Sequence, residues 1–218
     1  MPWKTPAVLL FPLRNMMDLA VPVIGILRGI DEDFFPDLMA AAFEAGLQAM
    51  EVTMNTAGAE RIVGKNLSRV PNGKYLGIGT VRNLEEARKA VGAGAAFLVS
   101  PNTDSRVIEY AKGQNVPVIA GAFSPTEVYA AWSSGAWMVK VFPCGLLGPS
   151  YIRELRGPFD GIDLVAVGGV NLENLRGYFD AGVRAVGASS ALFGKTALGE
   201  KDLKKLSGHV KRFVGACP

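Results

Sequence analysis

The sequence predicts an α/β protein whose eight strands close into a (β/α)8 barrel (a TIM barrel), as a single domain over residues 1–218. Short apolar runs alternate with longer amphipathic stretches, and the runs recur roughly 20–30 residues apart, about the length of one strand–helix unit. Eight such runs occur without a break in composition. This number favours a closed barrel, because an open sheet usually has fewer strands and a glycine-rich nucleotide loop after the first one.

The expected strands are short, largely unbroken and mostly rich in Val, Ile and Leu, as strands buried on both faces of a parallel sheet are. They are Ala20–Leu27, Leu47–Thr53, Tyr75–Thr80, Ala95–Ser100, Val116–Gly121, Ala136–Phe142, Ile162–Val167 and Val183–Gly187. The first is followed by Arg28 and Gly29 and does not lead into a GxGxxG loop.

Helix signals lie between these runs. Asn83–Glu86 and Ser124–Glu127 have the spacing of capping boxes. A glycine that ends a helix is expected at Ala45–Gly46, Ala93–Gly94, Ser134–Gly135 and Ala181–Gly182, each just before a strand. A short helix before Val21 is expected to cap the bottom of the barrel, and Lys201–Val214 to form a last outer helix.

Composition restricts the partners and the compartment. The net charge is only +3, and no basic run is longer than Lys204–Lys205, so nucleic-acid binding is not expected. Cys144 and Cys217 form no CxxC pair and no disulfide framework, which favours a reducing cytoplasm. The apolar stretch Pro6–Leu13 is short and interrupted by proline, so neither a signal peptide nor a membrane span is expected there.

Lys140 is the first candidate for chemistry, because it lies inside the apolar run Ala136–Phe142. Burial of an ammonium is costly and lowers its pKa, and a neutral amine that faces a barrel interior can attack a ketone to form an imine. The alternative is a structural ion pair inside the barrel. Catalysis is favoured over that alternative, because the other lysines occupy helical, loop or strand-edge positions where a solvated ammonium suffices.

Glu51 is the expected partner of Lys140, because it too lies within an apolar strand. A buried carboxylate and a buried ammonium lower each other's cost when they are close. Glu51 could transfer protons during imine chemistry, or it could only neutralise Lys140 in a salt bridge.

A phosphate site is expected after the last two strands, where barrels often bind phosphate through backbone N–H groups. Gly168 and Gly169 follow the seventh strand, and Ser189 follows the eighth. Arg28 ends the first strand and could hold a carboxylate or a phosphate, or could face solvent.

Other strand ends carry weaker signals. Thr53, Thr80 and Ser100–Asn102 could hydrogen-bond a carboxylate but are also ordinary turn residues. His209 is the only histidine and lies far from any strand end, which argues against a metal site of several histidines. Cys144 lacks a histidine base and is a poor nucleophile candidate.

The order of these residues resembles the class I 2-keto-3-deoxy-6-phosphogluconate aldolases, a family that includes the phosphogalactonate and 4-hydroxy-2-oxoglutarate aldolases. The resemblance runs from about Val21 to Phe193. It is carried by Glu51–Thr56, Gly77–Val81, Ser100–Asn102, Val139–Pro143, Gly148–Ile152 and Val167–Val170.

The resemblance implies a carbon–carbon lyase that cleaves a 2-keto-3-deoxy-6-phospho sugar acid to pyruvate and D-glyceraldehyde 3-phosphate, without a metal or organic cofactor, as a homotrimer. It implies Lys140 as the Schiff-base lysine and Glu51 as the proton-transfer residue. The implied keto acid site comprises Thr80, Pro101 and Phe142, and the implied phosphate site comprises Gly168, Gly169 and Ser189.

One position departs from the gluconate-type pattern. Those enzymes usually have an arginine where this chain has Asn55, and Asn55 together with Arg28 looks more like the galactonate-type branch. We therefore expect both residues at the substrate. A 4-hydroxy-2-oxoglutarate aldolase is the alternative enzyme, and a non-catalytic phosphosugar-binding barrel is the alternative of another class.

Overall fold

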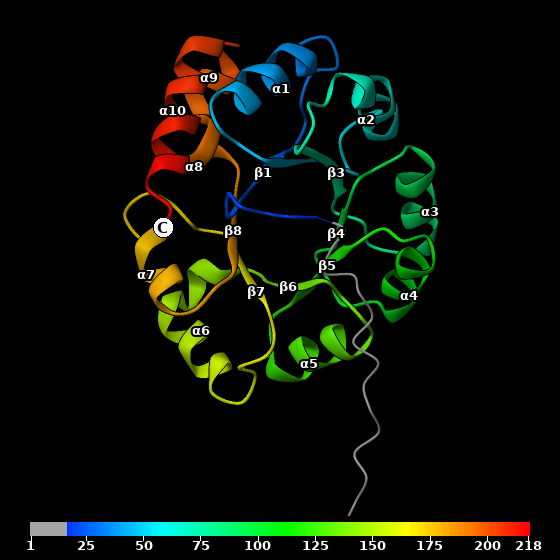
Figure 1. The fold of residues 1–218 in the computed structure, drawn as a ribbon, viewed down its shortest axis with the longest axis vertical. Coiled ribbons are helices and arrows are strands. Elements are labelled where there is room, and N and C mark those ends of the chain that lie inside the picture. Colours follow the sequence, from blue (N-terminus) through cyan, green and yellow to red (C-terminus); the bar gives the residue numbers. More distant parts are fainter. Residues whose placement is uncertain (1–16) are drawn as a thin grey trace, which may run out of the picture.

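The computed structural model describes residues 17–218, and its eight parallel strands close into a barrel in the order β1 to β8 (Figure 1). Each predicted apolar run overlaps one of these strands, so the predicted fold class is confirmed. The strands are β1 Val23–Leu27, β2 Ala49–Thr53, β3 Tyr75–Gly79, β4 Leu98–Val99, β5 Val118–Ala122, β6 Met138–Val141, β7 Leu164–Val167 and β8 Ala185–Ala188.

Helices surround the barrel and cover the outer face of the strands (Figure 1). They are α1 Phe35–Glu44, α2 Ala59–Asn66, α3 Leu84–Gly92, α4 Ser105–Gly113, α5 Pro125–Ser133, α6 Gly148–Arg156, α7 Leu175–Asp180, α8 Ser190–Phe193, α9 Lys195–Gly199 and α10 Leu203–Gly215. Residues 17–218 also contain the 3₁₀ turns η2 Leu67–Arg69 and η3 Cys144–Leu146. The last helix begins at Leu203, two residues later than expected, because the Asp202 side chain caps it by accepting the Lys205 N–H at 3.0 Å.

Several strands begin two or three residues later than their apolar runs, because the first apolar residue belongs to the end of the preceding helix. Its N–H bonds back to a carbonyl five residues earlier, across a left-handed residue, as in a Schellman motif. The expected glycines Gly46, Gly94, Gly135 and Gly182 all have positive φ, and Asn115 takes the same role before β5. The five bonds are Leu47 to Ala42, Ala95 to Ala90, Val116 to Ala111, Ala136 to Ala131 and Val183 to Tyr178.

The two expected capping boxes differ. At α5 the box is complete, with Ser124 and Glu127 each accepting the other's backbone N–H. At α3 the Asn83 side chain accepts the Glu86 N–H, but the Glu86 carboxylate accepts the N–H of Arg82 instead of that of Asn83. Both helices therefore begin where the sequence predicts.

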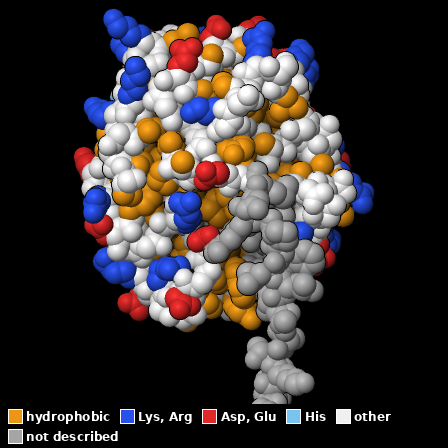
Figure 2. Space-filling view, in the orientation of Figure 1, with side chains coloured by type: hydrophobic (Ala, Val, Ile, Leu, Met, Phe, Trp, Pro, Cys, Tyr) orange, Lys and Arg blue, Asp and Glu red, His pale blue; other side chains and the backbone are white. Residues whose placement is uncertain are grey.

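The predicted helix before Val21 falls largely on residues 1–16, which lie outside the described part of the chain. Residues 17–22, just ahead of β1, form no helix. Within residues 17–218, no helix is long and apolar enough to cross a membrane. Basic and acidic side chains are interspersed over the face seen in Figure 2.

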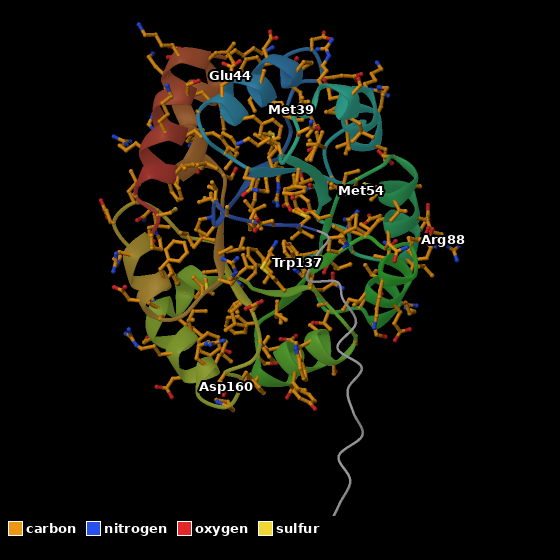
Figure 3. The ribbon with its side chains drawn as sticks, in the orientation of Figure 1. Met39, Glu44, Met54, Arg88, Trp137 and Asp160 are labelled. Carbon is orange, nitrogen blue, oxygen red and sulfur yellow. The ribbon has the colours of Figure 1, made fainter. Side chains whose placement is uncertain are left out.

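The core has two layers. Outward-facing strand residues pack against the helices, and inward-facing residues fill the lower barrel. Trp137, just before β6, packs against this inner cluster and lies near the centre of the view in Figure 3. Because side chains alternate along a strand, residues two positions after those of the inner cluster also point into the barrel, near the C-terminal ends of the strands, here called the upper end. That end forms the site.

Candidate active site

A cavity of about 660 Å³ lies at the C-terminal ends of the strands, the end where barrel enzymes hold their substrates. Nine predicted site residues line it: Arg28, Glu51, Thr80, Pro101, Lys140, Phe142, Gly168, Gly169 and Ser189. Asn55 does not, and neither do the weaker candidates Thr53, Ser100 and Asn102. Sequence reasoning missed Ile26 and Val167, which also line the cavity, and their signal is the two-residue spacing from Ile24 and Val165 in the inner cluster.

Strand alternation places Glu51 and Lys140 inside the barrel. Glu51 lies two residues after Ala49, and Lys140 two residues after Met138, and both earlier residues belong to the inner cluster. In the closed order, β2 and β6 are four strands apart and therefore lie on opposite sides of the barrel. The two charged side chains thus approach the same cavity from opposite walls.

Lys140 is 6% exposed, and its Nζ lies 5.0 Å from the centre of the Phe142 ring. Burial lowers the pKa of Lys140, Glu51 opposes that shift, and Arg28 adds to it. Among the ion pairs of residues 17–218, none includes Lys140. The described residues therefore contain no direct ion pair of Lys140, which was the structural alternative to catalysis.

Glu51 is 1% exposed, and burial raises the pKa of its carboxyl to about 7, with Lys140 and Arg28 acting in the opposite direction. Its Oε2 is buried without a hydrogen-bond partner among the described residues. A carboxyl with a pKa near neutrality can both accept and return a proton at physiological pH. Glu51 therefore lines the cavity with a carboxyl of which one oxygen has no protein donor among the described residues.

Inward-facing glycines make room for these groups. A Cβ on Gly79 would lie 2.6 Å from Glu51 Oε2 and closer still to Oε1. A Cβ on Gly121, which pairs with Lys140 across the sheet, would lie 2.6 Å from the backbone nitrogen of Asn102. The absence of side chains at Gly79 and Gly121 therefore lets the Glu51 carboxylate and the Pro101 loop occupy the upper barrel.

The two predicted phosphate loops meet on one wall of the cavity. Gly168 and Gly169 have φ of 90° and 77°, and Ser189 follows β8 at the same wall. The glycines also have a structural role, because the Gly145 N–H donates to the Gly168 carbonyl at 2.8 Å and a Cβ on Gly169 would lie 2.9 Å from Gly145 Cα. At Gly168 and Gly169 this wall has no side chain between the backbone and the cavity.

Two further lining residues come from strand ends. Thr80 follows β3 with φ of 56°, a left-handed conformation that is strained for a β-branched residue and is found mainly at functional sites. Arg28 follows β1 and is exposed, and its positive charge lowers the pKa of both Glu51 and Lys140. Thr80 and Arg28 thus place a hydroxyl and a guanidinium at the cavity rim.

The structure does not bring Asn55 to the cavity. Asn55 is exposed in a turn closed by the Thr56 N–H, which donates to the Thr53 carbonyl at 2.8 Å. Thr53 is fully buried and its hydroxyl contacts that of Thr56, so it does not face the cavity either. The expected substrate contact of Asn55 stays a prediction.

Cys144 and His209 lie apart from the cavity lining. Burial raises the pKa of the Cys144 thiol to about 11, which makes it a poor nucleophile, as expected. His209 lies on α10 beside Arg212. Within residues 17–218, no group of three or more His, Cys, Asp or Glu side chains is arranged to hold a metal ion.

Comparison with known proteins identifies relatives of this chain. Residues 15–208 match the family model "Aldolase: KDPG and KHG aldolase". The chain is 33% identical to the 2-dehydro-3-deoxy-6-phosphogalactonate aldolase of Escherichia coli K12, over 88% of this chain and 95% of the relative. It is 36% identical to a 2-dehydro-3-deoxy-phosphogluconate aldolase of Treponema pallidum, over 72% and 74%.

A solved structure described as native KDPGal has 30% sequence identity to this chain. It superposes with a TM-score of 0.84 over 99% of this chain and 97% of the other. The family model spans nearly the whole barrel, and its match agrees with a buried lysine and a buried glutamate facing one cavity. The chain belongs to the KDPG and KHG aldolase family and is a class I carbon–carbon lyase.

Proposed function

We propose that the protein reversibly cleaves a 2-keto-3-deoxy-6-phospho sugar acid to pyruvate and D-glyceraldehyde 3-phosphate, with Lys140 as the Schiff-base residue. The observation that carries this proposal is that Lys140 is buried at the wall of a 660 Å³ cavity. Burial lowers its pKa, and it takes part in no ion pair among the described residues. Loss of the ammonium proton frees the nitrogen lone pair for attack on a ketone carbon.

The reaction then follows from the two charged residues. Lys140 Nζ adds to the C2 ketone, and loss of water gives a protonated imine. Glu51, through a water, takes the proton of the C4 hydroxyl, and the C3–C4 bond breaks with its electron pair moving toward the imine. The aldehyde leaves and an enamine remains.

The same carboxyl completes the cycle. Glu51 returns its proton to C3 of the enamine, which forms the imine of pyruvate, and water then hydrolyses this imine to release pyruvate and free Lys140. A carboxyl with a pKa of about 7 suits both steps, because it is neither a strong acid nor a weak one at neutral pH. Glu51 Oε2 has no protein hydrogen-bond partner among the described residues, so the carboxyl is not held in a competing bond at that oxygen.

Substrate binding is divided between two ends of the cavity. We assign the keto acid to Thr80, Pro101 and Phe142, and the phosphate to the backbone of Gly168, Gly169 and Ser189. Arg28 is the one guanidinium that lines the cavity among the described residues, and it supplies charge to an anionic group of the substrate.

The decisive experiment traps the imine. The protein is incubated with pyruvate and borohydride, and its intact mass is measured beside that of Lys140→Ala. We expect one reduced pyruvate adduct on the wild type and none on the variant. No adduct on the wild type, or an adduct that persists in Lys140→Ala, would remove the mechanism.

The sugar epimer is tested by turnover. The 2-dehydro-3-deoxy-6-phosphogalactonate relative aligns over a larger share of its length than the phosphogluconate relative, which favours the galactonate epimer. Pyruvate release, coupled to lactate dehydrogenase, is measured on both epimers and on 4-hydroxy-2-oxoglutarate. A higher kcat/KM on the unphosphorylated substrate would instead favour the 4-hydroxy-2-oxoglutarate activity that the family name includes.

We also propose a homotrimer in a reducing compartment such as the cytoplasm. Five large apolar side chains are exposed near α5 and η3, namely Phe123, Tyr129, Trp132, Leu146 and Leu147. Exposed apolar surface of this kind is typical of an interface. Both cysteines are free thiols, which fits a reducing environment. Light scattering after size exclusion measures the oligomer, and a monomer would refute the trimer.

A further inference from the structure

The loop that carries Arg28 is attached to the turn after β2 by a buried threonine. The Gly29 N–H donates to Thr56 Oγ1 at 2.9 Å, directly beside Arg28 in the sequence. Thr56 Oγ1 also lies 3.1 Å from Thr53 Oγ1. Thr56 is 4% exposed and Thr53 is fully buried, so this pair of hydroxyls belongs to the interior rather than to the cavity.

The backbone of Thr56 is fixed as firmly as its side chain. Its N–H donates to the Thr53 carbonyl at 2.8 Å, and its carbonyl accepts the Ala59 N–H at 3.1 Å, at the first residue of α2. The hydroxyl is therefore presented from a rigid turn. On the other side of the bond, Gly29 has φ of 64°, a conformation in which the loop after β1 bends away from the strand direction.

Arg28 itself has no comparable attachment. It is exposed, and none of the hydrogen bonds or ion pairs among the described residues involves its guanidinium, although it lines the cavity. A long side chain of this kind samples many rotamers, so its position depends on where its backbone is held. The only side-chain bond to its immediate backbone neighbour among residues 17–218 is the one from Thr56.

We propose that Thr56, supported by Thr53, is a positioning residue that holds the Arg28 loop so that the guanidinium reaches the substrate anion. This inference rests on the proposed function, because it assigns Arg28 to that anion. Thr56 does not touch substrate, and its effect passes through Arg28. The family resemblance pointed to its neighbour Asn55, but Asn55 is the exposed residue of the turn and Thr56 is the buried one.

The test is a double-mutant cycle with Thr56→Val and Arg28→Ala, with Thr56→Ser as the matched control. Valine keeps the branched shape of threonine and removes the hydroxyl, whereas serine keeps the hydroxyl. We expect Thr56→Val to lower kcat/KM about tenfold, mainly through KM, and Thr56→Ser to stay within about threefold of wild type. In the Arg28→Ala background, Thr56→Val should change kcat/KM by less than about twofold.

A second readout separates positioning from general loosening of the fold. The charge of Arg28 holds down the pKa of Glu51, so a displaced Arg28 should move the acid limb of the kcat/KM profile to higher pH. Thr53→Val removes the supporting hydroxyl and should shift kcat/KM in the same direction by a smaller factor. It also serves if Thr56→Val does not fold.

The outcomes are distinct. If the wild type turns over substrate and Thr56→Val has an unchanged kcat/KM, this inference alone is overturned. It is also overturned if Thr56→Val lowers kcat/KM equally in the wild-type and Arg28→Ala backgrounds, or if Thr56→Ser loses activity. Absence of turnover by the wild type overturns the proposed function and this inference with it.

Discussion

Substitution of Gly79 by alanine should disable the site without unfolding the barrel. The new Cβ would lie 2.6 Å from Glu51 Oε2 and closer to the other carboxyl atoms, whereas ordinary carbon contacts lie at about 3.5–4.0 Å. The carboxylate must therefore move by roughly 1 Å. Since the atoms in conflict are the end of a flexible side chain, the backbone should keep its position and the fold should remain.

A displacement of this size is expected to lower kcat about 10²-fold, because misplacement of a reacting group by about 1 Å can cost that much. Pyruvate release gives kcat, and thermal unfolding checks the fold. Gly92→Ala is the matched control, since its Cβ would meet nothing within 4 Å. If Gly79→Ala keeps kcat within about threefold of wild type, the position of Glu51 does not limit the reaction. A further loss of kcat when Gly79→Ala is added to Glu51→Gln would show that Gly79 acts elsewhere.

Three further changes have defined outcomes. The pKa of Glu51 is raised from 4.5 to about 7 in the folded protein, so the native state binds this proton more tightly than the unfolded chain does and wild-type stability falls as pH rises from 4.5 to 7. Glu51→Gln does not titrate there. Its unfolding free energy in urea titrations should therefore increase, relative to that of the wild type, by about 3 kcal/mol from pH 4 to pH 8. Lys140→Met should abolish turnover and raise the melting temperature at pH 7. The pKa of Lys140 is lower in the folded protein than in the unfolded chain, so the lysine destabilises the native state fully below its folded pKa and stops doing so only above its unfolded pKa. An unchanged or lower melting temperature would contradict this. Ser124→Ala should cost about 1 kcal/mol of unfolding free energy by removing the α5 cap while kcat stays at the wild-type value, and a loss of activity would contradict a purely structural role.

The fold was predictable because strand and helix signals agree along the chain. Apolar runs set the strands, and Gly46, Gly94, Gly135 and Gly182 have the left-handed conformation that ends a helix. The starts of the strands were less predictable. Leu47, for example, is apolar because it closes the end of α1 and packs in the outer core, so its hydrophobicity does not distinguish a helix stop from a strand.

The charged core of the site was predictable for a related reason. Glu51 and Lys140 lie within strands, where alternation leaves an inward or an outward direction, and the outward face is filled by helices. Asn55 lies beyond the end of its strand, where one backbone bond of a turn decides which way each side chain points. Spacing along the sequence cannot supply that direction, which is why Thr56 was not singled out from the sequence.

The arrangement of the three charges explains why the lysine can stay reactive. A direct ion pair with Glu51 would stabilise the ammonium of Lys140 and raise its pKa, which opposes attack on a ketone. The barrel avoids this by placing Glu51 on β2 and Lys140 on β6, on opposite walls, while Arg28 adds positive potential that lowers the pKa of Lys140. The same separation leaves Glu51 with an unpartnered oxygen and a pKa of about 7. The feature that costs stability, two buried ionisable groups that form no direct ion pair, is thus the feature that supplies an amine and a proton carrier at neutral pH.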